Sequence, residues 1–482
     1  MNDRPNILFL MPDQLRSDFL GCYGAGFAKT PHVDALAASG TRFERCLSPT
    51  PICVPARASL MTGGSSLETG VTTNGQWLRP DLSECGIETW PQALARAGYR
   101  TYGVGKMHFY PWDAGWGFDE RAIAEDKRQI GIDDDYGRFL AEHGFAKQHA
   151  REFDGYHENG GACISPVPAE LQGDAWCADR AIEMLRTHDP STPFAMMVGF
   201  PSPHCPYDPP ADIAALFDPA DMPAPFASTP ESEALRPWLV QNMKRDWADI
   251  DYTTFTAAQI AKVRAHYSAL IHLVDRAVGR IMEALTETGL DDRTVIVFAS
   301  DHGDFVGDFG LVCKNFFMEG SIRVPMILRL PGQEPQVRMD AVALHDVCPT
   351  FLHLAGLAPR AGLDARSLLA RPDWSRIIAG LTHRGMMIER GGMKLARYIE
   401  GVVTLTDVTA DPGDQANLAH DPHHAATRAG LEAELASWIV RETAKGHADK
   451  RVPGDATSTP GPVPEGDIRA RGWKRPYPME IS

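Results

Sequence analysis

Long apolar runs and a leader segment are both absent from this sequence. No stretch of the 482 residues is apolar for long enough to cross a bilayer, which argues against a membrane-spanning helix. The first apolar run, Asn6–Met11, is short, follows Asp3 and Arg4, and ends at a Pro-Asp pair, so it does not resemble a signal peptide. We therefore expect a cytoplasmic protein with no membrane partner.

Paired cysteine motifs and an excess of positive charge are also absent. The nine cysteines are odd in number, scattered and free of any C-x-x-C pair, so neither a disulfide framework nor a structural zinc site is expected. Lys and Arg number 47 against 63 Asp and Glu, which gives a formal net charge of −16. Because nucleic acids attract clustered Lys and Arg, we expect no nucleic-acid partner. A locally basic pocket for a small anion remains possible in an acidic protein.

The apolar runs that are present are short and alternate with helical patterns. Buried strands are predicted at Asn6–Met11, Tyr99–Val104, Phe194–Phe200 and Thr294–Ala299. Helical periodicity is found at Thr89–Ala97 and at Ala257–Thr288. Strands that alternate with helices predict an α/β fold whose parallel sheet is covered on both faces.

The alternation weakens towards the C-terminus, which predicts three parts of unequal size. We expect a large α/β catalytic domain at 1–375, a small α+β subdomain at 376–450 and an extended tail at 451–482. Within them, Pro201–Pro230 is predicted as a long surface loop, Arg384–Asp407 as antiparallel strands and Pro422–Lys445 as a closing helix. The tail and the acidic composition are compatible with a homo-oligomer.

Each predicted strand is followed within a few residues by polar side chains suited to chemistry. These side chains are Asp13, then Lys106 and His108, then His204, and finally Asp301 and His302. In open α/β sheets, ligands bind beyond the carboxyl ends of the strands. Polar residues often end a strand for structural reasons, but four strands that bring Asp, Lys and His to one edge favour a catalytic site.

The segment 48–64, SPTPICVPARASLMTGG, contains the most informative cysteine. Pro55 suits the first turn of a helix, which places Cys53 just before a helix N-terminus, where an anion is favoured. Arg57 lies about one turn further on and brings a fixed positive charge near Cys53. From the residues alone, Cys53 is either an activated nucleophile or, as is more usual for a free thiol, a small buried apolar group.

This segment resembles the signature of the sulfatase family, the formylglycine-dependent members of the alkaline-phosphatase-like superfamily. Other segments resemble that family in the same order along the chain, from about Pro5 to Leu418. They are PNILFLMPDQ, GVGKMHF, DRTVIVFASDHGDFVGDFGLVCKNFFMEGSIRVPMIL and DPGDQANL. The resemblance implies an alkaline-phosphatase-like large domain with a mostly parallel sheet, and a smaller C-terminal α+β domain with a short antiparallel sheet.

The resemblance also implies a set of cofactors and metal ligands. Cys53 would be oxidised to formylglycine (3-oxoalanine) by a formylglycine-generating enzyme, and the hydrated aldehyde would attack sulfur. One divalent metal would be held by Asp13, Cys53, Asp301 and His302, with Gln14 as a further contact to metal or substrate. Calcium is the usual metal of the family, although the His302 nitrogen shifts the preference towards manganese.

The remaining site residues take their roles from the same resemblance. Lys106 and Lys314 would bind the sulfate oxygens, and His204 would protonate the leaving oxygen. His108 would act as the base that expels sulfate, Arg57 would hold the formylglycine oxygen, and Asn74 would contact substrate. We therefore expect a sulfuric ester hydrolase, an arylsulfatase-like enzyme, that acts on small-molecule sulfate esters.

The sequence leaves the substrate open. The Asp13-Gln14 and Asp301-His302 pairs resemble the branch that contains choline sulfatases, arylsulfatases and phosphonate monoester hydrolases. Lys106 and His108 favour sulfate esters over the alternative, a phosphonate or phosphate monoester hydrolase with promiscuous sulfatase activity. Aryl and small alkyl sulfates both fit, and Trp77, Trp112 and Trp116 are candidates for a cage around a choline group. If Cys53 stays unconverted, the chain would be a non-catalytic binding protein.

Overall fold

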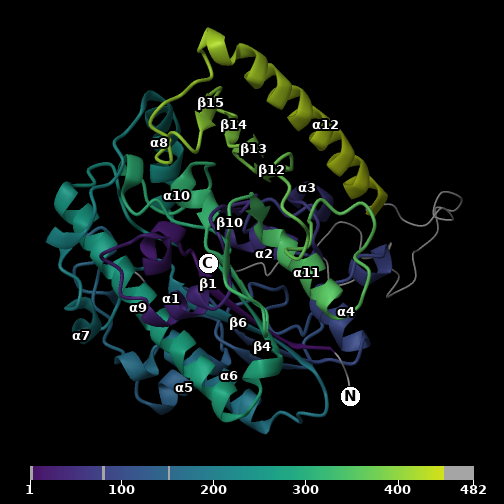
Figure 1. Cartoon of the computed structure of the whole chain (residues 1–482). Coiled ribbons are helices and arrows are strands. Elements are labelled where there is room, and N and C mark those ends of the chain that lie inside the picture. Colours follow the sequence, from purple (N-terminus) through teal and green to yellow (C-terminus); the bar gives the residue numbers. More distant parts are fainter. Residues whose placement is uncertain (1–3, 79–81, 150–151, 450–482) are drawn as a thin grey trace, which may run out of the picture.

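A mixed sheet of eight strands forms the centre of the protein (Figure 1). The structure is a computed structural model that describes residues 4–78, 82–149 and 152–449, so the predicted tail at 451–482 lies outside the described residues. The sheet order is β10-β2-β9-β7-β1-β6-β4-β5. Its strands are β1 (Asn6–Asp13), β2 (Thr41–Phe43), β4 (Arg100–Gly105), β5 (Glu120–Ile123), β6 (Phe194–Pro203), β7 (Thr294–Ala299), β9 (Met326–Arg329) and β10 (Gln336–Arg338).

The predicted parallel α/β sheet is confirmed in its middle. The four strands predicted from apolar runs are β1, β4, β6 and β7, and they lie side by side and parallel. Only β9 runs antiparallel to its neighbours β7 and β2. The short strands were not predicted, because two to four residues are too few to show a period. Three of them form a separate small sheet: β3 (Cys46–Leu47), β8 (Arg323–Val324) and β11 (Val342–Ala343).

Both faces of the central sheet are buried, which explains why its strands are almost continuously apolar. Along β1, Leu8 and Leu10 belong to one core, whereas Ile7, Phe9 and Met11 belong to the core on the opposite face. All five side chains are fully buried. The alternation of side chains along a strand therefore supplies two cores from a single apolar run.

Helices cover each face of the sheet (Figure 1). One face packs against α1 (Pro31–Ala38), α6 (Gly173–Thr187) and α9 (Ala257–Glu287), and the other against α2 (Cys53–Thr62), α4 (Trp90–Arg96) and α11 (Val347–Leu354). The predicted helices α4 and α9 each begin at a capping box, formed by Thr89 with Gln92 and by Thr256 with Gln259. The remaining shorter helices are α3 (Ser66–Thr69), α5 (Asp135–Glu142), α7 (Ala211–Ala214), α8 (Pro230–Met243) and α10 (Glu319–Ile322).

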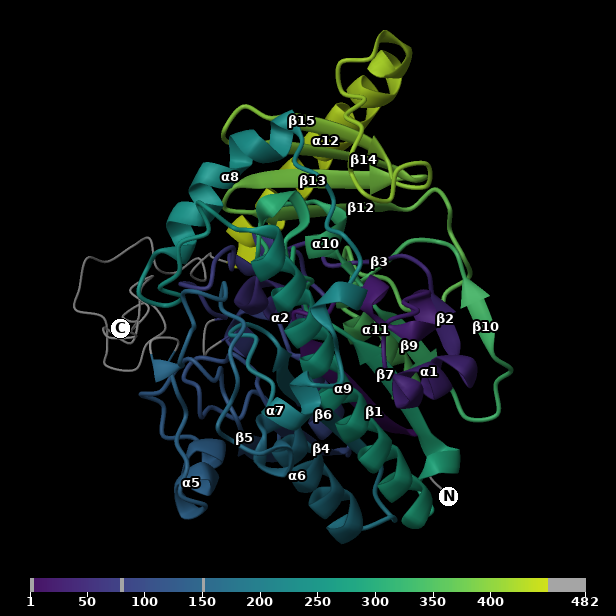
Figure 2. The same ribbon diagram turned by 90° about the vertical axis from the view of Figure 1, so that its left-hand side faces the viewer.

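A small antiparallel sheet and a long helix lie together at one end of the molecule (Figures 1 and 2). The sheet has the order β12-β13-β14-β15, and α12 packs across it. The elements are β12 (Ile377–Thr382), β13 (Gly385–Arg390), β14 (Met393–Tyr398), β15 (Val403–Asp407) and α12 (Ala425–Asp449). The predicted antiparallel strands and closing helix are confirmed, whereas the domain division at residue 375 stays a prediction.

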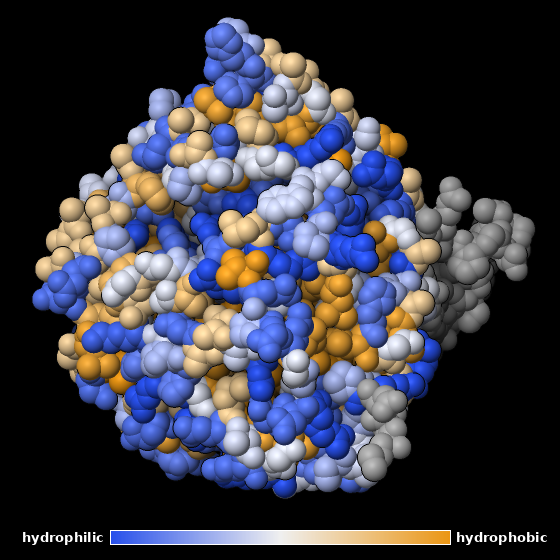
Figure 3. Space-filling view, viewed as in Figure 1, coloured by the Kyte–Doolittle hydropathy of each residue, from blue (hydrophilic) through white to orange (hydrophobic). Residues whose placement is uncertain are grey.

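One loop prediction was wrong. Residues 201–210 were expected on the surface, but all ten are buried, and β6 extends as far as Pro203. The Pro-rich and Asp-rich composition of this segment favoured a surface loop, but Pro and Asp also occur in buried turns around a polar site. The face shown in Figure 3 is largely hydrophilic, with hydrophobic residues in separate patches. Within the described ranges, no helix is both long and apolar enough to cross a membrane.

Candidate active site

The candidate site lies at the carboxyl ends of four neighbouring strands. Asp13 ends β1, Lys106 directly follows β4, His204 directly follows β6, and Asp301 lies two residues beyond β7. Because β7, β1, β6 and β4 are consecutive in the sheet, their ends meet at one edge. All four side chains are buried, with at most 1% of each residue exposed.

Helix α2 carries Cys53 and Arg57 to this edge. The helix begins at Cys53 itself, so the cysteine is its first residue and does not precede it as expected. The Val54 N–H of the first turn donates to Asn74 Oδ1 at 3.0 Å. One turn on, Arg57 Nε donates to Asp301 Oδ2 at 2.9 Å, and its NH1 donates to the Lys106 carbonyl at 2.5 Å. Arg57 thus links the ends of β4 and β7 to the start of α2.

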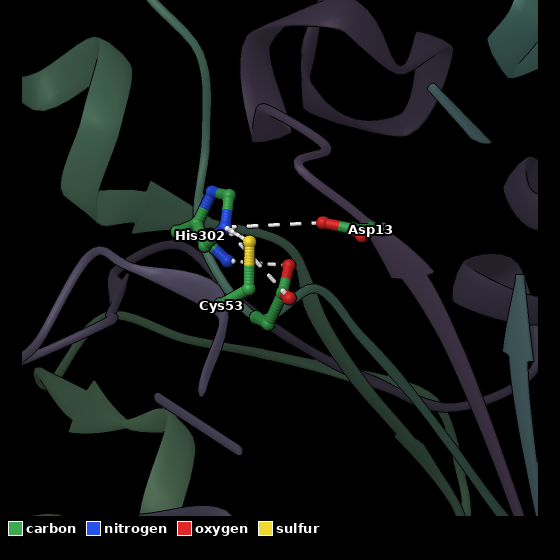
Figure 4. Close-up of side chains that lie close together, drawn as sticks. Asp13, Cys53 and His302 are labelled. Atoms are coloured by element: carbon green, nitrogen blue, oxygen red, sulfur yellow. Dashed lines mark hydrogen bonds and ion pairs between the residues drawn. The ribbon is translucent and has the colours of Figure 1, made fainter. Parts of the chain in front are cut away.

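Asp13, Cys53, Asp301 and His302 form a buried group of potential metal ligands. Their ligand atoms all lie within 4.8 Å of one another. His302 Nε2 is 3.2 Å from Cys53 Sγ and 3.8 Å from Asp13 Oδ1 (Figure 4). The other ring nitrogen, Nδ1, lies 2.9 Å from the Gly303 carbonyl oxygen, and donation to that oxygen leaves the Nε2 lone pair free for a metal.

The Asp13 carboxylate shows how well this group fits a cation. Neither of its oxygens accepts a hydrogen bond from a described residue, although the side chain is fully buried. Burial would raise the pKa of Asp13, but the Lys106 ammonium, which forms an ion pair with Oδ2, acts together with His204 and Arg57 to hold the pKa well below the usual range. An ionised, buried carboxylate whose Oδ1 accepts no hydrogen bond from the described residues suits a hard divalent cation.

The Cys53 thiol sits in a field of positive charge. Burial alone would raise its pKa, but the charge of Lys314 and the nearby His302, His108 and His204 side chains lower the pKa well below that of a free thiol. The same field would favour an oxyanion at this position.

His204 and Lys314 are in direct contact. Lys314 Nζ lies 2.9 Å from His204 Nε2 and donates to Gln14 Oε1 at 2.5 Å. His204 Nδ1 lies 2.7 Å from the Cys205 carbonyl oxygen and donates to it, which leaves Nε2 to face Lys314. Burial and the Arg128 and Lys314 charges would lower the pKa of His204, but the net shift is upward, with Cys205 and Asp13 raising it.

His108 is held mainly through its backbone. Its N–H donates to Glu125 Oε1 at 3.1 Å, and the residue has a positive φ of 56°. The ring atom Nε2 is 3.8 Å from Asp126 Oδ2, while Nδ1 has no hydrogen-bond partner among the described residues. The ring is thus anchored on one side and has a free nitrogen on the other.

The sequence interpretation missed the acidic and basic residues that follow β5. Asp126 accepts a hydrogen bond from Lys106 Nζ at 2.9 Å and also binds the guanidinium of Arg128. Burial would raise the pKa of Asp126, but Arg128 and Lys106 lower it far below the usual range, so the carboxylate is ionised. The run Glu125–Arg128 directly after a strand was an available signal, but β5 is too short and too polar at its start to be recognised.

Two of the three tryptophans named as candidates for a choline cage lie at one pocket. Trp77 stacks near Tyr110 with ring centroids 5.5 Å apart, and Trp116 is buried against Phe109. Trp77 and Trp116 line one small pocket beside His108, but Trp112 is not among its lining residues. This pocket therefore brings together two of the three candidate indoles, and a choline cage stays a prediction.

Comparisons with known proteins agree with this geometry. The sequence model of the family described as Sulfatase matches residues 5–357. A choline-sulfatase of Rhizobium meliloti (strain 1021) is 30% identical over 454 residues, which cover 89% of this chain and 85% of that protein. An arylsulfatase of Clostridium perfringens (strain 13 / Type A) is 30% identical over 398 residues, covering 76% of this chain and 78% of that protein. The crystal structure of a phosphonate monoester hydrolase of Agrobacterium radiobacter superposes with a TM-score of 0.77 at 25% identity, covering 91% of this chain and 96% of that one.

Proposed function

Because this chain belongs to the sulfatase family and is a sulfuric ester hydrolase, we propose that it cleaves aryl or small alkyl sulfate monoesters at the site around Cys53. The observation that carries the proposal is the arrangement of Asp13, Cys53, Asp301 and His302 as one buried ligand group beside the two lysines Lys106 and Lys314. A sulfate monoester is an anion, and its cleavage needs positive charge around the sulfate and a proton for the leaving oxygen.

The ligand group would hold one divalent cation, with calcium as the first candidate and manganese as the second. Asp13 and Asp301 offer carboxylate oxygens, His302 offers Nε2, and the side chain at position 53 completes the set. A formylglycine made from Cys53 by a formylglycine-generating enzyme would supply the nucleophilic oxygen, and the cation would add positive charge beside it. The buried Asp13 oxygens that accept no hydrogen bond from the described residues support this assignment.

Lys106 and Lys314 would bind the sulfate oxygens from two sides. Lys106 Nζ is held by Asp126 and Asp13, and Lys314 Nζ by Gln14 and His204, so both ammonium groups are fixed before substrate arrives. Preorganised charge in a buried site is the largest single contribution to many enzymatic rate enhancements.

The two histidines would divide the proton transfers. His204 Nε2, in contact with Lys314 Nζ, would deliver a proton to the leaving oxygen. His108, with Nδ1 free, would accept a proton in the step that releases sulfate. Arg57 would hold the position-53 side chain and Asp301 in place, and Asn74 would fix the start of α2 and contact substrate at the rim.

Phosphonate monoesters are the second candidate substrate, because the phosphonate monoester hydrolase of Agrobacterium radiobacter shares this fold. Lys106 and His108 favour sulfate, since they supply charge and a base for sulfate release. The test compares kcat/KM on para-nitrophenyl sulfate with kcat/KM on a phenylphosphonate ester. We expect the sulfate to be preferred, and a clear preference for the phosphonate would overturn this choice.

Peptide mass spectrometry at Cys53 tests the mechanism most directly. We expect active protein to carry the aldehyde, and Cys53→Ala to be inactive. An ordinary thiol at position 53 in fully active protein would contradict the proposal and leave a binding protein or another nucleophile. Metal analysis before and after chelation should show one divalent ion per chain, with activity restored by calcium or manganese. The cytoplasmic location and the homo-oligomer stay predictions.

A further inference from the structure

Arg128 is a partly buried cation next to the proposed proton donor. Its NH2 lies 3.2 Å from His204 Nε2, and its guanidinium lies 5.1 Å from the centre of the Trp247 ring. The same side chain donates two hydrogen bonds to Asp126, from Nε to Oδ1 at 2.9 Å and from NH2 to Oδ2 at 2.7 Å. This fork fixes the guanidinium plane before any ligand binds.

One nitrogen of this guanidinium is left over. NH1 is buried and donates to no described residue, whereas Nε and NH2 are both used. A buried charged donor without a partner is costly, and such donors in native structures usually have a ligand or water as their partner. NH1 is therefore a preformed donor for an oxygen that the chain does not supply.

The charge around Arg128 favours an anion. Asp126 is shared between Arg128 and Lys106, and Lys106 is also paired with Asp13. Lys314 adds a third cation on the other side of His204. Asp13 pairs with Lys106 and Asp301 pairs with Arg57, whereas Lys314 forms no ion pair with a carboxylate among the described residues, so positive charge remains around His204.

Arg128 also lies on the side from which the alcohol would leave. Its side chain is 13% exposed, compared with 1% for Lys106, so it stands nearer to solvent. His204 Nε2 is in contact with Arg128 on one side and with Lys314 on the other, so it lies between these two cations. A group attached to the leaving oxygen would therefore extend past His204 towards Arg128 and Trp247.

From this arrangement we propose that Arg128 is a specificity-determining residue whose NH1 binds an anionic oxygen on the alcohol part of the ester. The inference rests on the proposed function and narrows its substrate class to sulfate esters of alcohols or phenols that carry a carboxylate or a second sulfate. A quaternary ammonium in the same place would meet a buried guanidinium, so choline sulfate is a poor substrate.

The experiment compares esters that differ only in charge. The probes are para-carboxyphenyl sulfate and para-carbamoylphenyl sulfate, whose ring substituent is neutral. The meta isomers of both are also tested, because the distance to NH1 decides which ring position brings the carboxylate into contact with it. Wild-type enzyme is expected to prefer a carboxylate over its amide by about tenfold to a hundredfold in kcat/KM, the range for a charge-assisted hydrogen bond. In Arg128→Gln the preference falls below about twofold, and Arg128→Lys retains part of it.

The ratio within one variant cancels any loss of folded or converted enzyme. Arg121→Gln is the matched control, because Arg121 is a buried arginine of β5 that donates to the Trp112 and Ala114 carbonyls instead of facing His204. Its ratio is expected to equal that of wild type. Three results would each overturn the role of Arg128. They are equal kcat/KM on the carboxylate and the amide in wild type, a carboxylate preference that persists in Arg128→Gln, and a loss of that preference in Arg121→Gln as large as in Arg128→Gln. Failure of wild type to hydrolyse any of the esters would instead overturn the proposed function.

Discussion

At the scale of single residues, the site is a set of buried charges that hold one another in place. Lys106 touches Asp13 and Asp126, Arg57 touches Asp301, and Lys314 touches Gln14 and His204. Burying these charged groups costs free energy, which is offset only when each group has a well-placed partner. When one partner is lost, the other remains a buried charge without compensation. Substitutions here therefore change charge balance as well as chemistry.

Replacing His204 tests its role as proton donor. In His204→Asn we expect kcat/KM on an alkyl sulfate to fall by roughly 10²–10⁴, because an alkoxide needs a proton to leave. The loss on para-nitrophenyl sulfate should be much smaller, since nitrophenolate leaves unprotonated. Steady-state rates on both esters give the answer, and equal losses would show that His204 acts only on the architecture of the site.

The residues of the site were predictable to different degrees. Asp13, Cys53, Asp301 and His302 lie in motifs with fixed neighbours, and the structure brings them together, while their roles stay predictions. Asp126 and Arg128 were missed because an ion pair leaves no period in a sequence. Their importance comes from distances to Lys106 and His204, which depend on how β5 packs beside β4.

At the scale of elements, helix α2 begins without a side-chain cap of its own. Ile52 precedes the helix and offers no polar atom, so Asn74 from a distant loop accepts the Val54 N–H. Pro55 predicted from the sequence that a helix begins here. The residue that caps this helix could not be predicted, because Asn74 lies in a loop with no local pattern. The cap on the first turn of α2 is therefore supplied by a tertiary contact.

Two substitutions separate capping from substrate binding at Asn74. Asn74→Ala should lower the free energy of unfolding by about 1 kcal/mol, the usual effect of losing a helix cap. Asn74→Asp keeps an acceptor oxygen, so its stability should match wild type, as measured by urea unfolding. If Asn74→Asp is stable yet poorly active, the amide nitrogen contacts substrate; if Asn74→Ala is as stable as wild type, the capping role is wrong.

Helix α9 holds helix α1 through Asp275. Its Oδ1 accepts the N–H groups of His32 and Val33 at 3.0 and 2.8 Å, and Oδ2 has no partner among the described residues. Burial raises the pKa of Asp275 to about 7, despite the hydrogen bonds from Val33 and His32. The folded protein therefore keeps a proton here that the unfolded chain releases near pH 4.

This shift has a definite sign. Between about pH 4 and pH 7 the folded state binds more protons than the unfolded state, so the contribution of Asp275 to stability falls as the pH rises. The full effect is on the order of 4 kcal/mol, for a rise of about three pKa units at 1.4 kcal/mol each. Asp275→Asn removes this proton site, so unfolding free energies at pH 5 and pH 8 should differ less in the variant. An unchanged pH slope would show that Asp275 does not titrate in this window.

At the scale of the whole molecule, a charge cluster joins the large sheet region to the small antiparallel sheet. Arg45 binds Glu319 through two bonds, at 2.8 and 2.9 Å, and also binds Glu389 of β13. Lys394 of β14 reaches Glu319 at 2.8 Å and Asp414 at 2.9 Å. Burial would raise the pKa of Glu319, but Arg45 and Lys394 hold it far below the usual range.

Glu319→Gln leaves Arg45 and Lys394 buried with less negative charge. We expect a loss of roughly 3–5 kcal/mol in unfolding free energy at pH 7, the usual cost of breaking a buried ion pair. The loss should shrink as the pH falls below about 4, because acid protonates Glu319 in the unfolded wild-type chain while the folded state needs it ionised. Arg397→Gln, which removes an exposed pair with Glu432, is the control and should cost less than about 1 kcal/mol. Equal small losses in both variants would show that the cluster does not join the two regions.

The complete burial of Cys53 sets an order of events in time. The sulfur lies at the start of α2 with no part of the residue open to solvent, so an oxidising catalyst finds no route to it once the sheet and its helices have closed. If Cys53 is converted to formylglycine as proposed, conversion has to come while the chain is still emerging or unfolded, and folding then seals whichever side chain is present. Under that proposal a polypeptide that folds first keeps its thiol until it unfolds again.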